Sequence, residues 1–208
     1  MYLDPRSKLP SMTIGNRRVG YLEKPLIVTE IGINHFGSFQ KAMRLVDLAA
    51  ESGAEIIKVQ LHNASAEMSE HAKSVKPGNA NVSIYEVINE NSLDFVQEEK
   101  LRNYIFDHGL LYAATPFSRE AVDFLKDQDA DAIKIGSGEA DHQPLIDLVC
   151  QLEKPIIMST GMQSINSIAP SVDLIRTHKL PFALLHCTNL YPMPPKLARL
   201  AGIRELMK

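Results

Sequence analysis

Six short apolar runs, each followed by a small group of polar residues, set the strongest limit on how this chain can fold. The runs are Leu26–Val28, Ile56–Val59, Leu110–Ala114, Ala132–Ile135, Pro155–Met158 and Pro181–Leu185. Amphipathic helical patterns lie between most of the runs. This alternation is typical of parallel β/α units, which carry their functional residues at the carboxyl ends of the strands. The polar groups at those ends are Glu30, Lys58 with Gln60, Thr115, Lys134 with Ser137 and Glu139, Ser159 with Thr160, and His186 with Asn189.

The length of the chain favours an α/β fold of the (β/α)8 TIM-barrel type that is incomplete. A closed barrel typically takes about 250 residues, whereas this chain has 208 and no signal for a further strand. We therefore predict a single partial barrel domain over residues 1–208, with about six of the eight β/α units between residues 26 and 208. Residues 12–22 predict a short N-terminal hairpin with Gly15-Asn16 as its turn. A helix-like pattern runs from Leu197 to Lys208.

Composition argues against several classes of partner. A net charge of −3 and a hydrophobic content of 45% are ordinary for a soluble globular protein. There is no basic excess that would favour nucleic acid, and no apolar stretch approaches the roughly 18–20 residues that cross a bilayer. The first ten residues lack the apolar core of a signal peptide. Cys150 and Cys187 fit no metal or disulfide spacing, so we expect reduced thiols in a cytoplasmic protein.

Two segments carry more specific predictions. Residues 61–91 form a long polar connection, and connections longer than about 12–15 residues are usually functional or disordered. Within it, Val82–Ile88 is apolar enough to fold back onto the top of the barrel. In the sixth helix we expect Ser167 to be the N-cap, because Pro170 then falls in the first turn, where its missing N–H costs nothing.

Lys58 and Lys134 predict an anion site, because each lies in an otherwise apolar strand. A lysine in such a place is costly unless its charge is paired or meets an anion. A single lysine of this kind can also extend its ammonium to solvent at the strand end. Two of them at the carboxyl ends of one barrel favour a phosphate or carboxylate ligand.

Glycine- and hydroxyl-rich turns follow two of the strands, at 135–139 and 159–162. Glycine lets backbone N–H groups approach an anion, and the hydroxyls add donors, although a plain βα turn has the same composition. Glu30 and Glu139 are carboxylates at the same end of the barrel, where desolvation would raise a pKa toward acid–base use. We assign Asp141 and His142 to the entry of the next helix.

Histidines offer no metal site in this sequence. His186 follows an apolar strand, and we interpret it as a core residue with satisfied hydrogen bonds. The others are interpreted as loop or surface residues: His35, His62, His71, His108 and His178.

Seven segments, most of them at the predicted strand ends, carry a more specific pattern. They are Glu30-Ile31-Gly32-Ile33-Asn34-His35, Lys58-Val59-Gln60, Pro77-Gly78-Asn79-Ala80, Thr115-Pro116-Phe117, Lys134-Ile135-Gly136-Ser137-Gly138-Glu139, Ser159-Thr160-Gly161-Met162 and Leu185-His186-Cys187-Thr188-Asn189-Leu190-Tyr191-Pro192. In this order they resemble the N-acetylneuraminate (sialic acid) synthase family. The resemblance runs from about residue 12 to residue 208. It implies a (β/α)8 barrel enzyme, a transferase of sialic acid biosynthesis that condenses phosphoenolpyruvate with N-acetylmannosamine and water, releasing phosphate.

The resemblance also implies roles for individual residues. Phosphoenolpyruvate would be held by Lys58, Thr115, Lys134, Ser137, Ser159 and Asn189. The amino sugar would be contacted by Glu30, Asn79, Glu139 and Tyr191, with Gln60 close to it. Of these, we assign Glu139 to proton transfer, and Glu30 to orienting sugar hydroxyls or to acting as the partner acid–base group.

The family's divalent metal, Mn²⁺ or Mg²⁺, would be held by two histidines in Ser-Asp-His-Thr and Arg-His-Phe motifs. Neither motif occurs in this chain, so no residue of it is assigned to the metal. The family's C-terminal antifreeze-like domain, which lends an arginine to the partner subunit of a homodimer, is likewise not recognised here. We therefore expect a C-terminally truncated barrel that, by itself, does not turn over at a useful rate.

Other functions are compatible with the same residues. Legionaminic and pseudaminic acid synthases share these motifs and differ in the acceptor sugar. A Schiff-base aldolase would use Lys58 or Lys134 as a nucleophile of lowered pKa. An inactive barrel fragment would only bind or associate through open sheet edges.

Overall fold

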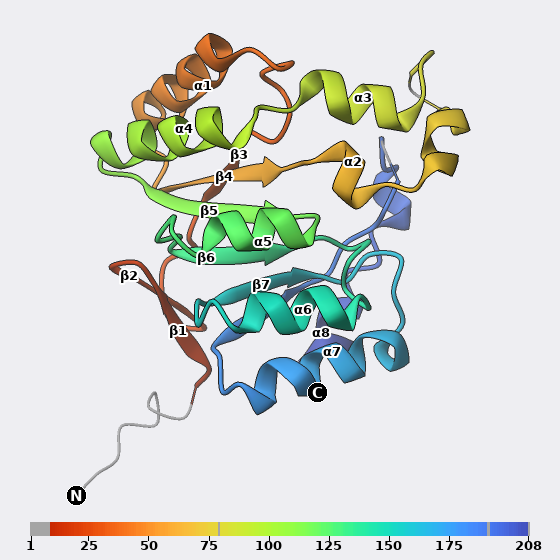
Figure 1. Cartoon of the computed structure of the whole chain (residues 1–208). Helices are drawn as coiled ribbons and strands as arrows, with labels where there is room; N and C mark the ends of the chain where they lie inside the picture. The colour runs from red at the N-terminus through yellow and green to blue at the C-terminus, as the bar shows by residue number, and fades with distance from the viewer. Residues whose placement is uncertain (1–8, 79, 191, 208) are drawn as a thin grey trace, which may run out of the picture.

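A computed structural model describes residues 9–78, 80–190 and 192–207, and it contains the expected parallel sheet. Its strands are β3 (Val28–Glu30), β4 (Ile56–Leu61), β5 (Leu111–Pro116), β6 (Ala132–Ile135), β7 (Ile156–Ser159) and β8 (Phe182–Leu185). The strands lie side by side in chain order, and every neighbouring pair is parallel (Figure 1). The sheet is curled into part of a TIM barrel, which confirms the predicted fold class.

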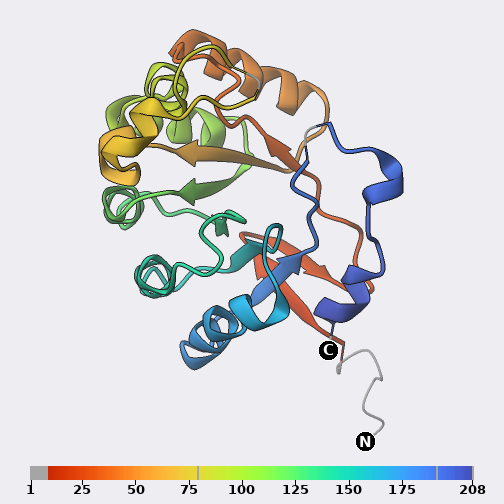
Figure 2. The same cartoon turned by 90° about the vertical axis from the view of Figure 1, so that its right-hand side faces the viewer.

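Helices line one side of this sheet, as the view onto the carboxyl ends of the strands shows (Figure 2). They are α1 (Phe39–Glu51), α4 (Phe95–Asp107), α5 (Arg119–Leu125), α6 (Gln143–Cys150) and α7 (Ile165–Thr177). Each turns an apolar stripe toward the sheet, with Val46, Ile105, Val149 and Ile175 among the fully buried residues. Burying the helix stripes against the strands forms the main core and leaves the carboxyl ends of the strands free for polar side chains.

The N-terminal hairpin lies under the amino ends of the strands. It is formed by β1 (Ser11–Ile14) and β2 (Arg17–Gly20), with the turn at the predicted Gly15-Asn16. Ile14 is buried in a second apolar cluster with residues from the amino-terminal halves of four strands, namely Ile56, Ala113, Ala132 and Ile157. Gly15 has φ +54, and a Cβ there would meet Leu111 and Asp131. Only glycine fits this turn without strain, because the turn is pressed against the bottom of the sheet.

The long polar connection contains short helices rather than an open loop. These are α2 (Ala64–Glu67), the 3₁₀ helix η2 (Glu70–Ser74) and α3 (Ile84–Asn91). A capping box between Ser83 and Glu86 starts α3, which covers most of the apolar stretch noted at 82–88. Figure 1 shows α2 and α3 at the carboxyl end of β4.

Two expectations for the second half of the chain were wrong. Ser164, and not Ser167, is the N-cap of α7, and a reciprocal capping box between these serines satisfies the first backbone donors. Pro170 therefore lies inside the helix, where it lacks the N–H that would donate a backbone hydrogen bond. The run from Leu197 to Lys208 is not one helix: η3 (Pro195–Leu197) and α8 (Gly202–Leu206) are separated by turns.

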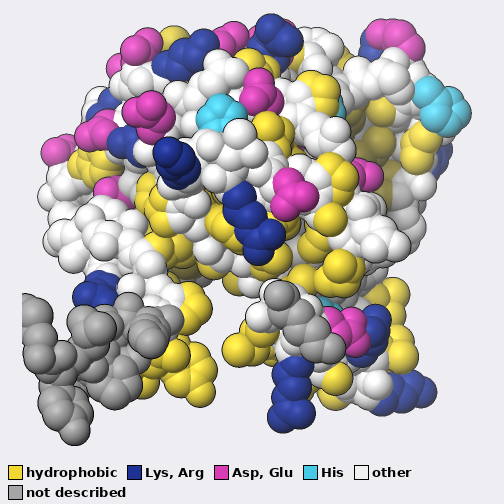
Figure 3. All heavy atoms as spheres, turned by 90° about the horizontal axis from the view of Figure 1, so that it is seen from below, with side chains coloured by type: hydrophobic (Ala, Val, Ile, Leu, Met, Phe, Trp, Pro, Cys, Tyr) yellow, Lys and Arg dark blue, Asp and Glu magenta, His cyan; other side chains and the backbone are white. Residues whose placement is uncertain are grey.

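Both ends of the sheet are open in the described part of the chain, because β3 and β8 each have one strand neighbour. Beside β8 lies a largely apolar hollow of about 910 Å³, lined by Val172, Phe182, Leu184, Ile203 and Met207 among others. Hydrophobic side chains are visible among charged ones in the view from below (Figure 3). None of the described helices combines the length and the apolar character needed to cross a membrane.

Candidate active site

The register of the first three barrel strands brings one group of polar residues together. Glu30 lies opposite Lys58, and Gln60 lies opposite Thr115. Lys58 forms an ion pair with Glu30, and its Nζ donates a hydrogen bond of 3.3 Å to Thr115 Oγ1. The Lys58 side chain is 14% exposed and that of Glu30 is 41% exposed. Lys58 thus finds a counter-charge within the chain.

Lys134 is different, because it is buried and has no carboxylate within ion-pair distance in the described part of the chain. Its Nζ donates to the Ser159 hydroxyl at 2.6 Å and to the Ile135 carbonyl at 2.8 Å. Burial, and then the nearby charge of Lys58, lower the pKa of Lys134 to about 8. A buried ammonium held only by neutral oxygens is stabilised strongly by an incoming anion.

Two turns continue the site from Lys134 toward the edge of the sheet. The Gly161 N–H donates to Ser137 Oγ at 3.1 Å, and the Gln163 side chain donates to the Ser137 carbonyl at 3.1 Å. A Cβ on Gly161 would collide with Asn189 Oδ1, which shows how closely Asn189 approaches this backbone. The structure therefore places Ser137, Ser159 and Asn189 on the Lys134 side of the site, as a cradle of neutral donors and acceptors.

Glu139 is partly buried on the same side. Burial raises the pKa of Glu139, the nearby charge of Glu67 raises it further, and Lys134 and His142 oppose the shift. A Cβ on Gly136 would meet the Glu139 carboxylate, so this carboxylate folds back over its own turn. A carboxyl group with a raised pKa beside a cationic site has the properties of a general acid.

Two of the histidines expected to be loop or surface residues lie in loops but are buried. His35 is 2% exposed, and its Nδ1 accepts a hydrogen bond from the Gly37 N–H at 3.2 Å. His62 directly follows β4 and is also buried. Burial lowers the pKa of His35. The position of His62, two residues after Gln60 at a strand end, was the signal that sequence reasoning missed.

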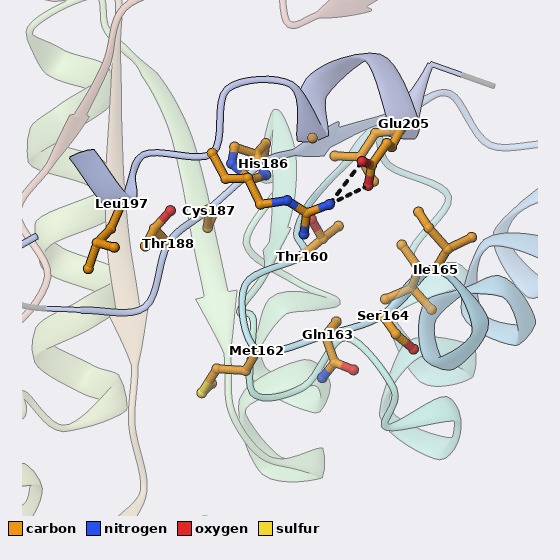
Figure 4. Close-up of a pocket in the computed structure, with 14 residues that line it drawn as sticks. Thr160, Met162, Gln163, Ser164, Ile165, His186, Cys187, Thr188, Leu197 and Glu205 are labelled. Atoms are coloured by element: carbon orange, nitrogen blue, oxygen red, sulfur yellow. Dashed lines mark hydrogen bonds and ion pairs between the residues drawn. The ribbon is translucent and has the colours of Figure 1, made fainter. Parts of the chain in front are cut away.

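His186 is not the satisfied core residue that the sequence suggested. It follows the edge strand β8 and packs against Gly202, and its Nε2 is buried without a hydrogen-bond partner among the described residues. It lines a hollow of about 450 Å³ together with Thr160, Cys187 and the Arg199–Glu205 ion pair (Figure 4). This hollow adjoins the Lys134 side of the site through Thr160 but is not lined by Lys58 or Lys134.

Two of the proposed sugar contacts, Asn79 and Tyr191, lie outside the described residues. Within residues 9–78, 80–190 and 192–207, no three His, Cys, Asp or Glu side chains come together as a metal-ligand set. The metal implied by the family resemblance is therefore not assigned to residues of this chain.

Comparison with known proteins identifies the family to which these residues belong. A model of the NeuB family matches residues 45–208. The chain belongs to the NeuB family. This NeuB chain is 30% identical over 192 residues to the N,N'-diacetyllegionaminic acid synthase of Campylobacter jejuni, covering 89% of this chain and 58% of that protein. It is 28% identical over 196 residues to human N-acetylneuraminate-9-phosphate synthase, covering 92% and 54%.

The solved structures agree with this assignment. The N-acetylneuraminic acid synthetase of Leptospira borgpetersenii, crystallised in complex with citrate, superposes on this NeuB chain with a TM-score of 0.85 at 27% identity. The match covers 95% of this chain and 66% of that one. The NeuB chain thus spans somewhat more than half the length of the curated relatives that it matches.

Proposed function

We propose that this NeuB chain provides the phosphoenolpyruvate-binding part of a nonulosonic acid synthase. The observation that carries the proposal is Lys134, a buried ammonium without a carboxylate partner among the described residues. The ammonium donates to the Ser159 hydroxyl and the Ile135 carbonyl and lies near Lys58, and Ser137 contacts the turn that follows Ser159. Phosphoenolpyruvate carries both a phosphate and a carboxylate, which suit two lysines and a cradle of neutral donors.

In the proposed reaction, C3 of phosphoenolpyruvate forms a bond to the aldehyde carbon of the acceptor sugar, and the aldehyde oxygen takes up a proton. Water adds at C2 to give a tetrahedral intermediate, and cleavage of its bond to the phosphate oxygen leaves the 2-keto acid and inorganic phosphate. Glu139 would supply or receive a proton in these steps, since its pKa is raised by burial. Glu30, which is ion-paired with Lys58, would orient hydroxyls of the sugar.

The acceptor is proposed to be N-acetylmannosamine or a related N-acetylated hexose. The relatives named above include a legionaminic acid synthase and an N-acetylneuraminate-9-phosphate synthase, and a pseudaminic acid synthase of Campylobacter jejuni is 28% identical over 200 residues. These enzymes belong to the same family, and their names imply different acceptor sugars. A binding panel of N-acetylated hexoses in the presence of phosphoenolpyruvate distinguishes them.

Calorimetry with phosphoenolpyruvate tests the anion site. We expect the Lys134→Ala and Lys58→Ala variants each to weaken binding by at least about tenfold, because each removes a charge-assisted hydrogen bond. Lys154→Ala is the matched control, since Lys154 precedes β7 at the opposite end of the strands and is paired with exposed Asp129. Unchanged affinity in both site variants would show that the anion site is wrongly placed.

A Schiff-base aldolase is the second candidate, and the lowered pKa of Lys134 favours it specifically. A neutral amine is the form that attacks a carbonyl carbon and then loses water to give the imine. Incubation with pyruvate and borohydride followed by mass measurement separates the two functions. A reduced adduct on Lys134 supports the aldolase, whereas phosphoenolpyruvate binding without an adduct supports the synthase.

A further inference from the structure

A buried histidine–carboxylate pair lies next to the sugar side of the proposed site. His62 Nδ1 is 2.8 Å from Glu67 Oε1, and the two side chains are 6% and 5% exposed. The other carboxylate oxygen of Glu67 accepts the backbone N–H of Asn63 at 3.2 Å. Glu67 is thereby held at the start of the connection that follows β4, and it fixes one edge of the imidazole ring.

The rest of the ring is held as firmly. The face of His62 stacks on Phe117, with ring centroids 4.2 Å apart and an angle of 9° between the planes. Phe117 directly follows β5, the strand that pairs with β4. Fixed by a carboxylate at one edge and an aromatic ring on its face, His62 has one nitrogen, Nε2, left to face a different group.

That group is the side chain of Gln60. His62 Nε2 lies 3.4 Å from Gln60 Oε1, a long contact of the kind that often tightens when a ligand binds. Gln60 Oε1 in turn shares the space above Gly32 with Glu30, since a Cβ on Gly32 would be 3.4 Å from the first and 3.0 Å from the second. Contacts therefore run from Glu67 through His62 to Gln60, and Glu30 borders the same space above Gly32.

We propose that His62, oriented by Glu67, is a positioning residue that fixes the Gln60 amide for recognition of the acceptor sugar. This rests on the proposed function, because the sugar is the ligand of that function. The pair does not contact the Lys134 cradle in any hydrogen bond of the described residues, so it should act on sugar binding and leave phosphoenolpyruvate binding unchanged. A fixed amide avoids the entropic cost of ordering Gln60 at each binding event.

Two substitutions of His62 separate positioning from a purely structural role. His62→Gln extends an amide toward the Nε2 position, which faces Gln60, whereas His62→Asn retains only a group near the Nδ1 position, which faces Glu67. The probes are phosphoenolpyruvate and N-acetylmannosaminitol, the reduced sugar, which has no aldehyde and cannot condense. We expect His62→Asn to bind the reduced sugar about tenfold more weakly and His62→Gln to retain most of the affinity.

A Glu67→Ala variant should also weaken sugar binding, and Glu70→Ala on the neighbouring exposed Glu70–Lys73 pair is its matched control. Thermal melting checks folding. A measurement on the unsubstituted chain needs no variant: the ring nitrogen resonances of His62 should shift when the reduced sugar is added to the complex with phosphoenolpyruvate.

The outcomes are distinguishable. Failure of the unsubstituted chain to bind phosphoenolpyruvate overturns the proposed function itself. Any of three results overturns the role of His62. These are phosphoenolpyruvate binding without sugar binding, unshifted His62 resonances, and equal sugar affinity in His62→Asn and the unsubstituted chain. Sugar affinity retained in His62→Asn and lost in His62→Gln would assign His62 to the support of Glu67 instead, and also overturns the proposal.

Discussion

Glu98 should make the stability of this protein fall as the pH rises, and Glu98→Gln should remove that dependence. Glu98 lies in α4 with 2% exposure, and its Oε2 has no hydrogen-bond partner among the described residues. The Tyr112 hydroxyl of β5, near Glu98, is likewise buried without a hydrogen-bond partner in the described part of the chain. Burial, together with the charge of Asp94, raises the pKa of Glu98 from 4.5 to about 8.

The size of the effect follows from this pKa. A difference of about 3.5 pKa units, at about 1.4 kcal/mol each, corresponds to about 5 kcal/mol between the folded and unfolded chains. The unfolded chain releases the Glu98 proton near pH 4.5, whereas the folded chain keeps it until about pH 8. Between these values the free energy of unfolding therefore decreases by about 1.4 kcal/mol for each pH unit, and above pH 8 this group adds no further change.

Urea unfolding at pH 5, 6, 7, 8 and 9 measures this contribution. Between pH 5 and pH 8 we expect the free energy of unfolding to fall by about 4 kcal/mol less in Glu98→Gln than in the unsubstituted chain, because the amide stays neutral. Glu99→Gln, an exposed neighbour in α4, is the matched control and should leave the pH profile unchanged. Parallel profiles for Glu98→Gln and the unsubstituted chain would refute the reasoning that Glu98 is protonated in the folded state.

Three further predictions concern the anion site, the hairpin and one helix cap. Phosphoenolpyruvate affinity should be constant below pH 8 and fall up to about tenfold per pH unit above it, as Lys134 loses its proton; calorimetry that finds constant affinity from pH 7 to 9.5 contradicts this. Gly15→Ala should lower the free energy of unfolding by about 1–3 kcal/mol, because its positive φ is combined with a collision at Asp131. Gly53→Ala, which has a positive φ but open space, should cost less in the same urea titration. Ser164→Ala should cost about 1 kcal/mol by loss of the α7 cap, and a neutral result would argue against the observed helix start.

The order of the β/α units could be predicted because it depends on local pattern. The strand at 132–135 was located at its observed bounds, and the other strands within about two residues of theirs. Asp141 and His142, assigned to the entry of a helix, directly precede α6, which begins at Gln143. The prediction of the α7 N-cap was wrong because two serines compete for that position. The helix begins at the capping box of Ser164 although this start places a proline inside the helix.

The candidate site was predictable to the extent that parallel strands carry their polar residues to one edge. Lys58 and Lys134 were singled out because each lies in an otherwise apolar run, and Thr115 and Ser159 because each directly follows one. The sequence did not show that Glu30 neutralises Lys58 while Lys134 has no such partner among the described residues. That difference depends on the register of β3 against β4, which places Glu30 opposite Lys58.

By itself, then, the sequence determined the succession of strands and helices and the chemistry available at the carboxyl ends of the strands. Hydrophobic periodicity acts over a few residues, so it can be read without knowing which segments meet. Only the tertiary structure decided which of these groups are buried: His62 against Phe117, Glu98 beside Tyr112, and Gly15 under the sheet. Each of these contacts joins segments distant in the chain, and the desolvation that results alters charge and hydrogen bonding in ways that no local pattern encodes.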